Sequence, residues 1–593
     1  MPLIHTQCRA LISGALHELF PQVSPEQIAE ALILETPPSP DMGDIGVPMF
    51  PLAKLCRTAP PVIAAKAAES LAENPAARDT GEFFCQGPYL NLRLNRPRAA
   101  YGILHTIQTQ GDRYGSLGDD GAPPLKGRRV MVEFSGPNTN KPLHLGHLRN
   151  DAIGESVSRI LACAGAEVRK VNIINNRGVH ICKTMLAYQK FHEQRGDTPA
   201  SLGVKSDRFV GDCYVEYNGY AQDHPEAEAE AQNLLVLWEQ GDPAVRKLWD
   251  QMNRWATEGI FETYRRTGVS FDAFYYESDT YLKGRDEVLK GLHGGVFYRE
   301  ADGSVWVNLE EIGLDKKVLL RKDGTALYIT QDLGTAVFRH DDWPFDRLVY
   351  VVGSEQQYHF KVLFYCLKKL GYPWAHNLYH LSYGMVNLPE GKMKSREGTV
   401  VDGDDLLDSL KALALEEIRE KGREDALGDP DAVAEAVALG ALHYFLLQQS
   451  PAKDMLFDPR ESLSFTGNTG PYLQYMGARL SSILKKAAES GVVSDPSPEA
   501  AALLLRDEEW ALIKLLGDFP AVILRAAEAL DPSLLAGHVY ETAKAFGRFY
   551  HECPIVGAES AALAGSRLHL AICTLTVLRK GMGLLLAPFL ESM

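Results

Sequence analysis

The chain has 593 residues, of which 45% are apolar, and its 61 Lys and Arg against 77 Asp and Glu give a formal net charge of −16. A chain of this length is too long for one hydrophobic core, so we expect three or more domains, and the apolar content excludes a disordered or fibrous protein. The negative total argues against attachment to nucleic acid by overall charge, although local basic strips can coexist with it.

The nine cysteines are scattered along the chain and form no C-x-x-C pair. An odd number at these spacings disfavours a disulfide framework and a zinc ribbon, and fits a reducing, cytoplasmic compartment. Apolar residues at the N-terminus recur at helical spacing, which predicts a folded amphipathic helix rather than a signal peptide. The one segment long enough for a membrane span is interrupted by charge, so we expect no membrane partner; the interrupting residues are Arg567, His569, Arg579 and Lys580.

The first part of the chain, residues 1–110, predicts a small α/β domain. It contains the opening helix, a helical stretch over Lys54–Glu73 and a strand over Tyr89–Leu94. The polar, Gly-rich run over Gly111–Lys126 then predicts a linker to the next domain.

Residues 125–403 predict a Rossmann-like domain with a parallel sheet. Strand, turn and helix recur there, with strands expected at Arg129–Phe134, Val168–Asn175 and Leu348–Gly353. This is the spacing of βαβ units, which pair as parallel strands.

Two further segments are predicted to be helical. Between about 190 and 281 the pattern is helical and highly charged, which indicates an insertion into the sheet domain. From Asp404 onward strand signals vanish and apolar residues repeat at every third and fourth position, so residues 404–593 predict an all-helical domain.

The most informative segment is Glu133–Asn150, in which a strand ends in a Gly/Pro/Asn turn and continues into a helix. Such a junction places free backbone N–H groups and the positive end of a helix dipole at the carboxyl edge of the sheet, where α/β domains bind nucleotides. His144 and His147 are predicted on one helical face and can donate protons to phosphate oxygens. Gly146 between them lets a flat ring lie against the backbone. An isolated pair of this kind is also typical of surface histidines.

A second segment, Gly391–Gly398, places three cations in five positions between glycines. Such a loop can close over a triphosphate and offset the charge that develops as pyrophosphate leaves. Taken alone, the pattern favours a solvated basic loop.

Together, the two segments resemble the paired HIGH and KMSKS signatures of class I aminoacyl-tRNA synthetases, in the same order and with a domain inserted between them. The resemblance covers nearly the whole chain, because Asp41–Asp44 with Lys54 is similar to the N-terminal domain of one family of that class. It implies ATP-dependent activation of L-arginine to arginyl-adenylate and transfer to the 3′-terminal ribose of tRNA(Arg), in translation. The segments that resemble arginyl-tRNA synthetases are Glu133–Asn150, Tyr328–Asp332, Tyr350–His359 and Thr469–Arg479.

The resemblance also implies which residues handle ATP, with Mg²⁺ accompanying the nucleotide and no metal held by protein side chains. The basic loop departs from the usual order, since Ser395 or Arg396 stands where a second lysine is usual, and which cation dominates stays open. The catalytic residues implied are His144, His147, Lys394 and Arg396. The ATP-binding residues implied are Pro142, His144, Gly146, His147, Lys392, Lys394 and Ser395.

The amino-acid pocket can also be argued from chemistry. A guanidinium is planar, permanently charged and offers a fork of donors, so its pocket needs carboxylates placed for paired hydrogen bonds. Carboxylates left unpaired by another amino acid would reject it, and we therefore expect no editing domain. Each of these residue types, seen singly, is more often structural. The arginine-binding residues implied are Glu133, Asn138, Tyr328, Asp332 and Gln356.

The helical part resembles the anticodon-binding domain of the same family. RNA loops with unstacked bases are recognised by aromatic stacking and Arg contacts, although aromatic residues at helical spacing are also typical of a core. By family analogy, the N-terminal domain would contact the tRNA elbow. The tRNA-binding residues implied are Tyr472, Gln474, Tyr475 and Arg479.

Two alternatives stay open. The first is a synthetase for another amino acid or a smaller nucleotidyltransferase; Glu133 and Asp332 argue against it, because a neutral amino acid has no use for two carboxylates. The second is a catalytically silent scaffold that binds tRNA or a protein; the intact residues His144, Gly146 and His147 argue against it. We expect a monomer, and the resemblance implies that the first reaction step requires bound tRNA.

Overall fold

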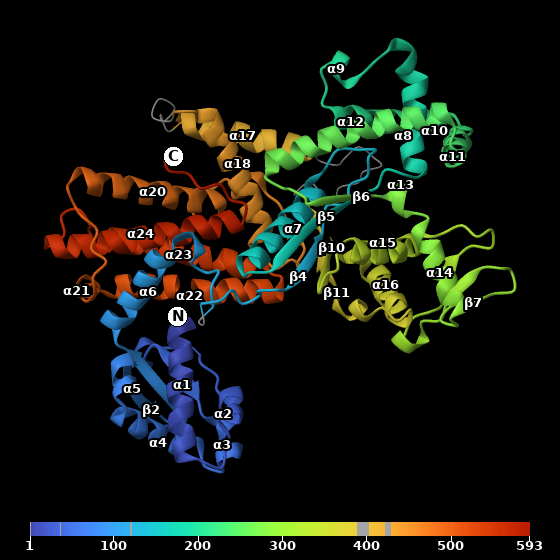
Figure 1. The fold of residues 1–593 in the computed structure, drawn as a ribbon. Coiled ribbons are helices and arrows are strands. Elements are labelled where there is room, and N and C mark those ends of the chain that lie inside the picture. The colour runs from blue at the N-terminus through green and yellow to red at the C-terminus, as the bar shows by residue number, and fades with distance from the viewer. Residues whose placement is uncertain (1, 36, 119–120, 388–401, 421–427) are drawn as a thin grey trace.

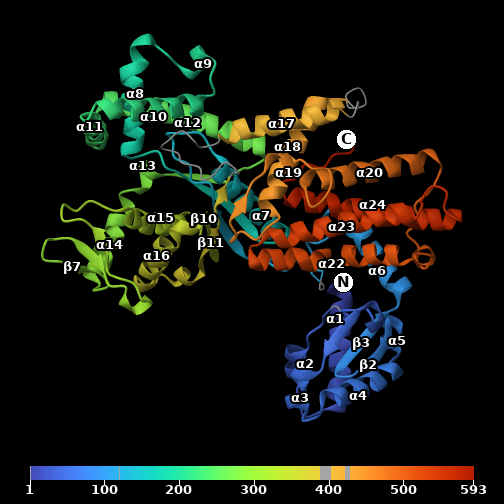
Figure 2. The ribbon, with the colours of Figure 1, turned by 180° about the vertical axis from the view of Figure 1, so that it is seen from behind.

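The molecule consists of an N-terminal α/β unit, a central sheet covered by helices, a helical insertion and a C-terminal helical part (Figure 1). The view from behind in Figure 2 shows the N-terminal unit standing below the helical part, joined to it near α1 and α6. The predicted Rossmann-like class with a small α/β unit and a helical part is confirmed. The computed structural model describes residues 2–35, 37–118, 121–387, 402–420 and 428–593.

The N-terminal unit has a three-stranded antiparallel sheet of order β1–β3–β2. The helix predicted over 54–73 is two helices, because Arg57 adopts a left-handed conformation (φ 51°) and Pro60 begins the next helix. The elements are α1 (Pro2–Leu19), α2 (Pro25–Ala31), η1 (Pro40–Met42), β1 (Ile45–Pro48), α3 (Phe50–Cys56), α4 (Pro60–Glu73), α5 (Pro75–Thr80), β2 (Gly81–Gln86) and β3 (Tyr89–Leu94).

The central sheet is parallel and has the strand order β11–β10–β4–β5–β6. Because β4 pairs with both β5 and β10, the chain leaves β4 on one side and returns to its other side. The carboxyl ends of β4 and β10 therefore form the switch point at which α/β sheets bind ligands. The strands are β4 (Arg129–Glu133), β5 (Glu167–Ile174), β6 (Ala273–Tyr276), β10 (Arg347–Gly353) and β11 (Leu378–Tyr383).

Both faces of this sheet are buried, since successive side chains of a strand point to opposite sides. Val130 and Val132 of β4 belong to one hydrophobic core and Met131 to another. This burial explains why the strands are continuous apolar runs in the sequence. The covering helices are α7 (Leu145–Cys163) in the first core, and α15 (Tyr328–Asp342) and α16 (Gln357–Lys369) in the second.

The insertion is helical as predicted, but the range 190–281 also contains β6, which is the edge strand of the central sheet. This strand was not predicted from the sequence, and neither was a small antiparallel sheet of order β7–β8–β9. The elements from here to β12 are α8 (Val179–Phe191), η3 (Glu193–Arg195), α9 (Pro199–Leu202), α10 (Ser206–Asp223), α11 (Ala227–Gln240), α12 (Pro243–Thr267), α13 (Glu277–Thr280), α14 (Lys283–His293), β7 (Tyr298–Arg299), β8 (Val305–Val307), η4 (Glu310–Ile312), β9 (Lys317–Leu320), η5 (Ser354–Gln356), η6 (Pro373–Asn377) and β12 (Val386–Asn387).

In the described residues of the C-terminal part, 402–420 and 428–593, the elements are helical apart from the two-residue strand β13, which pairs in parallel with β12. Two of its helices, α18 and α24, are long and apolar enough to cross a membrane, but they are 61% and 72% buried within the molecule, as core helices are. The elements are α17 (Gly403–Glu420), α18 (Pro430–Leu447), β13 (Met455–Leu456), α19 (Pro459–Ser462), α20 (Gly470–Glu489), α21 (Pro498–Ala501), α22 (Asp507–Ala529), α23 (Pro532–Glu552) and α24 (Ala561–Leu584).

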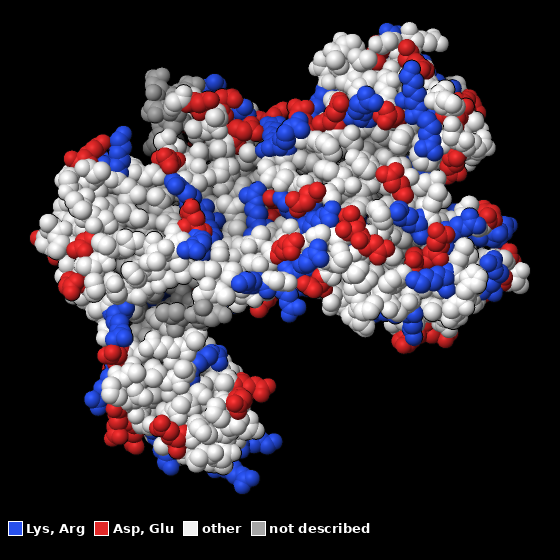
Figure 3. Space-filling model, in the orientation of Figure 1, with Lys and Arg blue, Asp and Glu red and all other residues white. Residues whose placement is uncertain are grey.

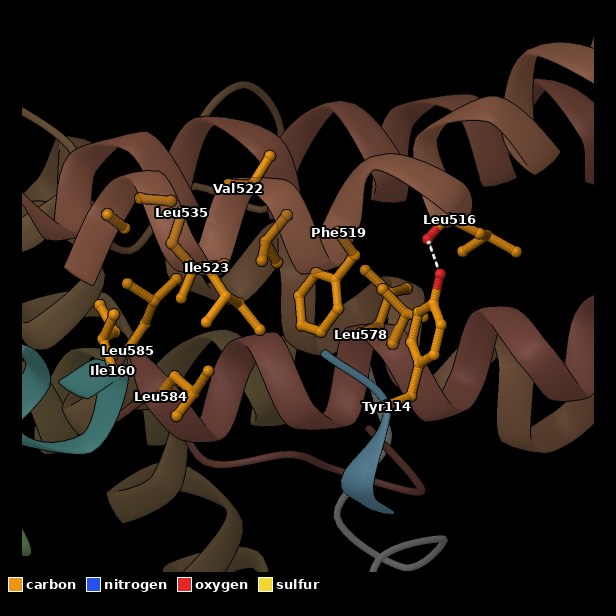
Figure 4. Close-up of a cluster of buried hydrophobic side chains, with 14 of the residues drawn as sticks. Tyr114, Ile160, Leu516, Phe519, Val522, Ile523, Leu535, Leu578, Leu584 and Leu585 are labelled. Atoms are coloured by element: carbon orange, nitrogen blue, oxygen red, sulfur yellow. Dashed lines mark hydrogen bonds between the residues drawn. The ribbon is translucent and has the colours of Figure 1, made fainter. Parts of the chain in front are cut away.

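The segment that connects the N-terminal unit to the central sheet packs against the C-terminal helical part. It runs through α6 (Arg96–Gln110) and η2 (Gly111–Arg113), and α6 packs against α21, α22 and α24. Tyr114 is buried beside Phe519 and donates a 2.8 Å hydrogen bond to the carbonyl oxygen of Leu516 (Figure 4). Leu516 lies four residues before Pro520, which has no N–H to offer that carbonyl. Tyr114 thus satisfies the acceptor that the proline leaves unpaired inside α22.

Candidate active site

A cavity of about 470 Å³ opens at the switch point, between the ends of β4 and β10. The turn after β4, the start of α7 and the segment after β10 all contribute to its wall. It therefore brings together predicted residues of both the ATP site and the arginine site. Those lining it are Glu133, His144, Gly146, His147 and Gln356.

The turn after β4 is held by buried asparagines. Ser135 has a left-handed backbone (φ 75°), which is uncommon outside glycine. Its N–H donates to Asn150 Oδ1 at 2.6 Å, and the N–H of Gly136 donates to Asn172 Oδ1 at 3.1 Å. Asn150 also donates to the Val351 carbonyl at 2.8 Å, so one side chain joins α7, β4 and β10. Sequence reasoning assigned no role to either asparagine.

Both histidines were predicted on one face of a helix, but only His147 lies in the helix. His144 precedes α7 and caps it, with its Nδ1 accepting the N–H of Gly146 at 3.1 Å. His147 lies in the first turn, and its Nδ1 accepts the N–H of His144, also at 3.1 Å. The ring centroids are 3.9 Å apart. The two rings are therefore adjacent although only one belongs to the helix.

These hydrogen bonds fix what each imidazole can offer. A neutral imidazole that accepts at Nδ1 carries its proton on Nε2, so both rings are single Nε2–H donors. Burial lowers the pKa of His144 to about 4 and the pKa of His147 well below its ordinary value. The positive charge of Lys141 lowers both further. Lys141 itself was missed as a site residue, although a cation three residues before His144 was visible in the sequence.

Gly146 is required by this arrangement. A Cβ atom at this position would lie 2.9 Å from Cε1 of His144, too close for ordinary contact. The flat ring predicted to lie against the glycine is thus that of His144. Pro142, another predicted ATP residue, does not line the cavity and instead approaches Gly211 of α10.

The two carboxylates of the predicted arginine pocket are each tied to a basic residue of the chain. Arg339 Nη1 donates to Glu133 Oε2, and His359 Nε2 lies 2.6 Å from Asp332 Oδ2. Burial raises the pKa of Glu133, the Arg339 charge opposes this, and the nearby Asp332 charge adds to it. In the described part of the chain, Glu133 Oε1 and Asp332 Oδ1 accept no hydrogen bond. Sequence reasoning missed Arg339 and His359.

The other predicted arginine residues are exposed around these carboxylates. Tyr328 and Asp332 lie one turn apart at the start of α15, and Tyr328 is 74% exposed. Asn138 is exposed and its backbone pairs with Asn175 after β5. Gln356 is exposed in η5, directly after β10. Tyr328, Asp332 and Asn138 do not line the cavity.

The predicted basic loop lies outside the described residues, and so do its named members Lys392, Lys394, Ser395 and Arg396. The described residues on either side of 388–401 both lie near the histidines. Val386 lines the cavity, and the backbone of Asp402 pairs with that of His144. The described chain therefore reaches the cavity at Val386 and the cap of α7 at Asp402.

The predicted tRNA residues lie on α20 with unequal exposure. Arg479 stands 4.1 Å from the ring centroid of Tyr550, and Tyr472 packs on Tyr540. Gln474 departs from the prediction, because it is fully buried and its Nε2 donates to the backbone carbonyls of Ala436 and Pro588. Tyr475 is half-buried. On the face shown in Figure 3, basic and acidic side chains are interspersed rather than gathered into one basic field.

One group of possible metal ligands occurs within the described ranges, in the insertion rather than at the cavity. Ligand atoms of His192, Cys213 and Glu216 lie within 4.8 Å of one another. Both ring nitrogens of His192 are already engaged, by Asp197 at 2.9 Å and Glu216 at 2.8 Å. Hydrogen bonding between these side chains therefore accounts for the group.

Comparison with protein families gives three matches that together span nearly the whole chain. The catalytic domain of class I tRNA synthetases (R) matches residues 121–459. The DALR anticodon binding domain matches residues 473–593, and the arginyl tRNA synthetase N terminal domain matches residues 6–94. The fold is thus that of a class I aminoacyl-tRNA synthetase, an enzyme class that uses ATP.

Individual relatives narrow the class. The arginine–tRNA ligase of Treponema denticola is 56% identical over 594 residues, covering 100% of both chains. That of Treponema pallidum subsp. pallidum is 57% identical over 576 residues, covering 97% of this chain and 96% of its own. The solved arginyl-tRNA synthetase of Thermus thermophilus superposes with a TM-score of 0.79 at 26% identity, covering 99% of each chain.

The chain belongs to the arginyl-tRNA synthetase family. Its activity is that of an arginine–tRNA ligase, with arginine, ATP and tRNA as substrates. The prediction from the paired signatures is confirmed, and the two alternatives, another class I enzyme and a silent scaffold, are set aside.

Proposed function

We propose that ATP binds with Mg²⁺ in the cavity between β4 and β10, and that the arginine carboxylate attacks its α-phosphate in line. One observation carries this proposal: the Nδ1 atoms of His144 and His147 are bonded to backbone, which leaves two Nε2–H donors fixed at the cavity wall. Donors held in place need no reorganisation when negative charge develops, so positioning and electrostatics supply most of the catalysis. Mg²⁺ arrives with the nucleotide.

The cations of the basic loop would offset the negative charge that develops on the departing pyrophosphate. Lys394 and Arg396 are the proposed phosphate contacts, with Lys392 and Ser395 supporting them. The positions of Val386 and Asp402, which precede and follow the loop in the sequence, support this assignment. Val386 lines the cavity, and the backbone of Asp402 pairs with that of His144. Lys141 is a further candidate, since its charge already acts on both imidazoles.

Glu133 and Asp332 are proposed to bind the guanidinium through their two open oxygens. Arg339 and His359 occupy one oxygen of each carboxylate, and a planar fork of donors could bridge the other two. Asn138, Tyr328 and Gln356 would complete the arginine site. An amino acid without a charged fork would leave these carboxylates unpaired, which favours arginine without editing.

In the second step, the terminal 2′-hydroxyl of tRNA(Arg) would lose its proton and attack the adenylate carbonyl, which breaks the bond to phosphate and releases AMP, with no covalent enzyme intermediate. Tyr472, Tyr475 and Arg479 are the proposed tRNA contacts of the helical part, and the N-terminal unit would contact the elbow. The proposed domains are 1–110, 125–403 and 404–593. The enzyme is proposed to act as a monomer in the cytoplasm; all nine cysteines are free thiols, as a reducing compartment requires.

The test compares two buried histidines. Aminoacylation of total tRNA with each of the twenty amino acids should give charging with arginine alone. His147→Ala should lower the rate by about 10²- to 10³-fold, the usual loss for one transition-state donor. The control is His443→Gln in α18, where burial lowers the pKa of the imidazole to about 4 but the ring bonds the Leu586 carbonyl away from the cavity. Wild-type rates in the His147 variant would refute the assignment.

A further inference from the structure

Arg149 is a fully buried cation whose hydrogen bonds within the described residues all go to backbone carbonyls. It is 0% exposed, and no salt bridge involves it in the described part of the chain. Nη1 donates to the carbonyl oxygens of Gly384 at 2.8 Å and Met385 at 2.9 Å. Nη2 donates to those of Pro451 at 3.2 Å and Lys453 at 2.6 Å. Burial of a charge is costly unless it is hydrogen-bonded, so this placement needs an explanation.

The four carbonyls belong to two segments that also pair with each other, since the Met455 N–H donates to the Met385 carbonyl at 2.9 Å and β12 pairs with β13. Gly384–Met385 joins β11 to β12, immediately before the 388–401 segment, whereas Pro451–Lys453 joins α18 of the helical part to β13. The N–H of Gly384 also donates to the Pro451 carbonyl at 2.9 Å. A Cβ at Gly384 would lie 2.5 Å from the backbone of Lys453, so the two backbones approach as closely as glycine allows.

Arg149 itself stands in the first turns of α7, two residues after His147. Its neighbour Asn150 bonds the turn at Ser135, the Val351 carbonyl and the Tyr383 hydroxyl. One short stretch of α7 therefore carries a phosphate-site histidine, the anchor of the turn after β4 and the four bonds of Arg149. Displacement of either backbone segment would be felt directly by this stretch, because close-packed interiors transmit strain.

We propose that Arg149 is a positioning residue that couples the phosphate site to the helical part of the enzyme. It fixes Gly384–Met385 relative to His147, and it ties both to the loop after α18, so tRNA bound to the helical part acts on arginine activation through it. The inference rests on the proposed role of His147. A guanidinium suits this role, since its planar fork directs donors at two segments at once, whereas an ammonium is a compact point charge.

The test uses Arg149→Lys and Arg149→Met, with Arg159→Lys as the matched control. Arg159 also lies on α7 and bonds backbone carbonyls of other parts, Gly583 at 2.7 Å and Gly268 at 2.9 Å, but it touches neither 384–385 nor 451–453. ATP–pyrophosphate exchange is measured against ATP, arginine and tRNA concentration, and tRNA affinity is measured separately by filter binding.

In both Arg149 variants, KM for ATP should rise about tenfold and the tRNA-stimulated exchange rate should fall about tenfold, a change of the size seen when a supporting contact is lost. KM for arginine and the tRNA dissociation constant should stay within about twofold. Arg159→Lys should leave all four values near wild type. If Arg149→Met fails to fold, the lysine variant, which keeps the charge, carries the test.

Two results would overturn the inference. Unchanged ATP and tRNA dependence with only a lower melting temperature would make Arg149 a structural residue. Equal rises in KM for ATP and arginine would make its effect unspecific. Failure of the underlying site assignment is distinguished by His147→Ala: if that variant is active, the phosphate site lies elsewhere, whatever the Arg149 variants do.

Discussion

Among the described residues, two carboxylate–arginine pairs are largely shielded from solvent, one at the cavity and one in the helical part. Glu509 pairs with Arg567 at 2.7 Å, and its other oxygen accepts the N–H of Arg506 at 2.9 Å. Glu133 pairs with Arg339 but accepts no second hydrogen bond within the described residues, and the Nε and Nη2 groups of Arg339 have no partner. The first pair is saturated, whereas the second is left open beside a cavity.

The difference indicates what each pair is for. A saturated buried pair holds two helices together and has nothing left to offer a ligand. An open pair retains hydrogen-bonding capacity that the described protein groups do not use, and native proteins rarely keep such groups without a reason. Variants that remove the same charge from both pairs should therefore give different results.

The largest effect is expected from Glu133→Gln. The amide keeps the shape of the side chain but leaves the Arg339 charge uncompensated and removes a carboxylate from the arginine site. We expect kcat/KM for arginine to fall about 10³-fold, with a loss of about 3 kcal/mol in the free energy of unfolding. Aminoacylation kinetics at varied arginine and urea unfolding measure the two effects. An unchanged KM for arginine would contradict the open-pair argument.

Glu509→Gln is the matched variant in the saturated pair. It leaves Arg567 buried without its counter-charge, and we expect a loss of about 3 kcal/mol in the free energy of unfolding, as for other broken buried pairs. Because this pair lies in the helical part, KM for arginine should remain within about twofold. A large change in KM would erase the distinction between the pairs. Urea unfolding and aminoacylation at one temperature give both values.

The position of each carboxylate within its own strand or helix could be predicted from the sequence. Glu133 ends an apolar strand and precedes a Gly/Pro turn, so its place at the carboxyl edge of the sheet followed from short-range pattern. The histidines, the glycine between them and the order of the parts were also accessible, because strand–turn–helix junctions are encoded within a few residues. The same locality explains the success with the helical part, whose 3.6-residue period is explicit.

The long-range contacts could not be predicted. Arg339 lies 206 residues from Glu133, and nothing in the pattern around either residue names the other. The strand β6 was included in the predicted helical insertion, because four residues between charged helices are too few to show the two-residue alternation of a strand. Gln474 looked like a surface residue beside Tyr472 and Tyr475, but its amide points into the core between two backbone carbonyls.

A buried carboxyl with no partner sharpens the comparison further. Asp151 is 1% exposed, and neither of its oxygens has a hydrogen bond. Burial raises its pKa to about 8, although the nearby Ser135 opposes the rise. The folded state thus holds a proton that the unfolded state releases near pH 4, so this group lowers stability progressively as pH rises from about 4 to about 8.

Asp151→Asn should remove that pH dependence. The amide cannot ionise, so we expect the variant to gain about 2 kcal/mol over wild type at pH 9, and to show no gain at pH 4, where the wild-type carboxyl is protonated in the folded state. Urea unfolding at the two pH values measures the difference. A gain that is equal at both would show that ionisation of Asp151 is not its cause.

The smallest effect on stability is expected from Tyr114→Phe, which removes one hydrogen bond to a backbone carbonyl of the helical part. Tyr114 donates to the Leu516 carbonyl that Pro520 leaves without an intrahelical partner, so α22 is saturated there as Glu509 is in its pair. Tyr114→Phe keeps the ring against Phe519 but leaves this buried acceptor open, and should cost about 1 kcal/mol of unfolding free energy with no change in aminoacylation. Thermal unfolding measures the loss. A variant as stable as wild type would mean that filling an open hydrogen-bond acceptor in the helical part contributes little to stability. The different behaviour of the two arginine pairs would then depend only on their distance from the cavity.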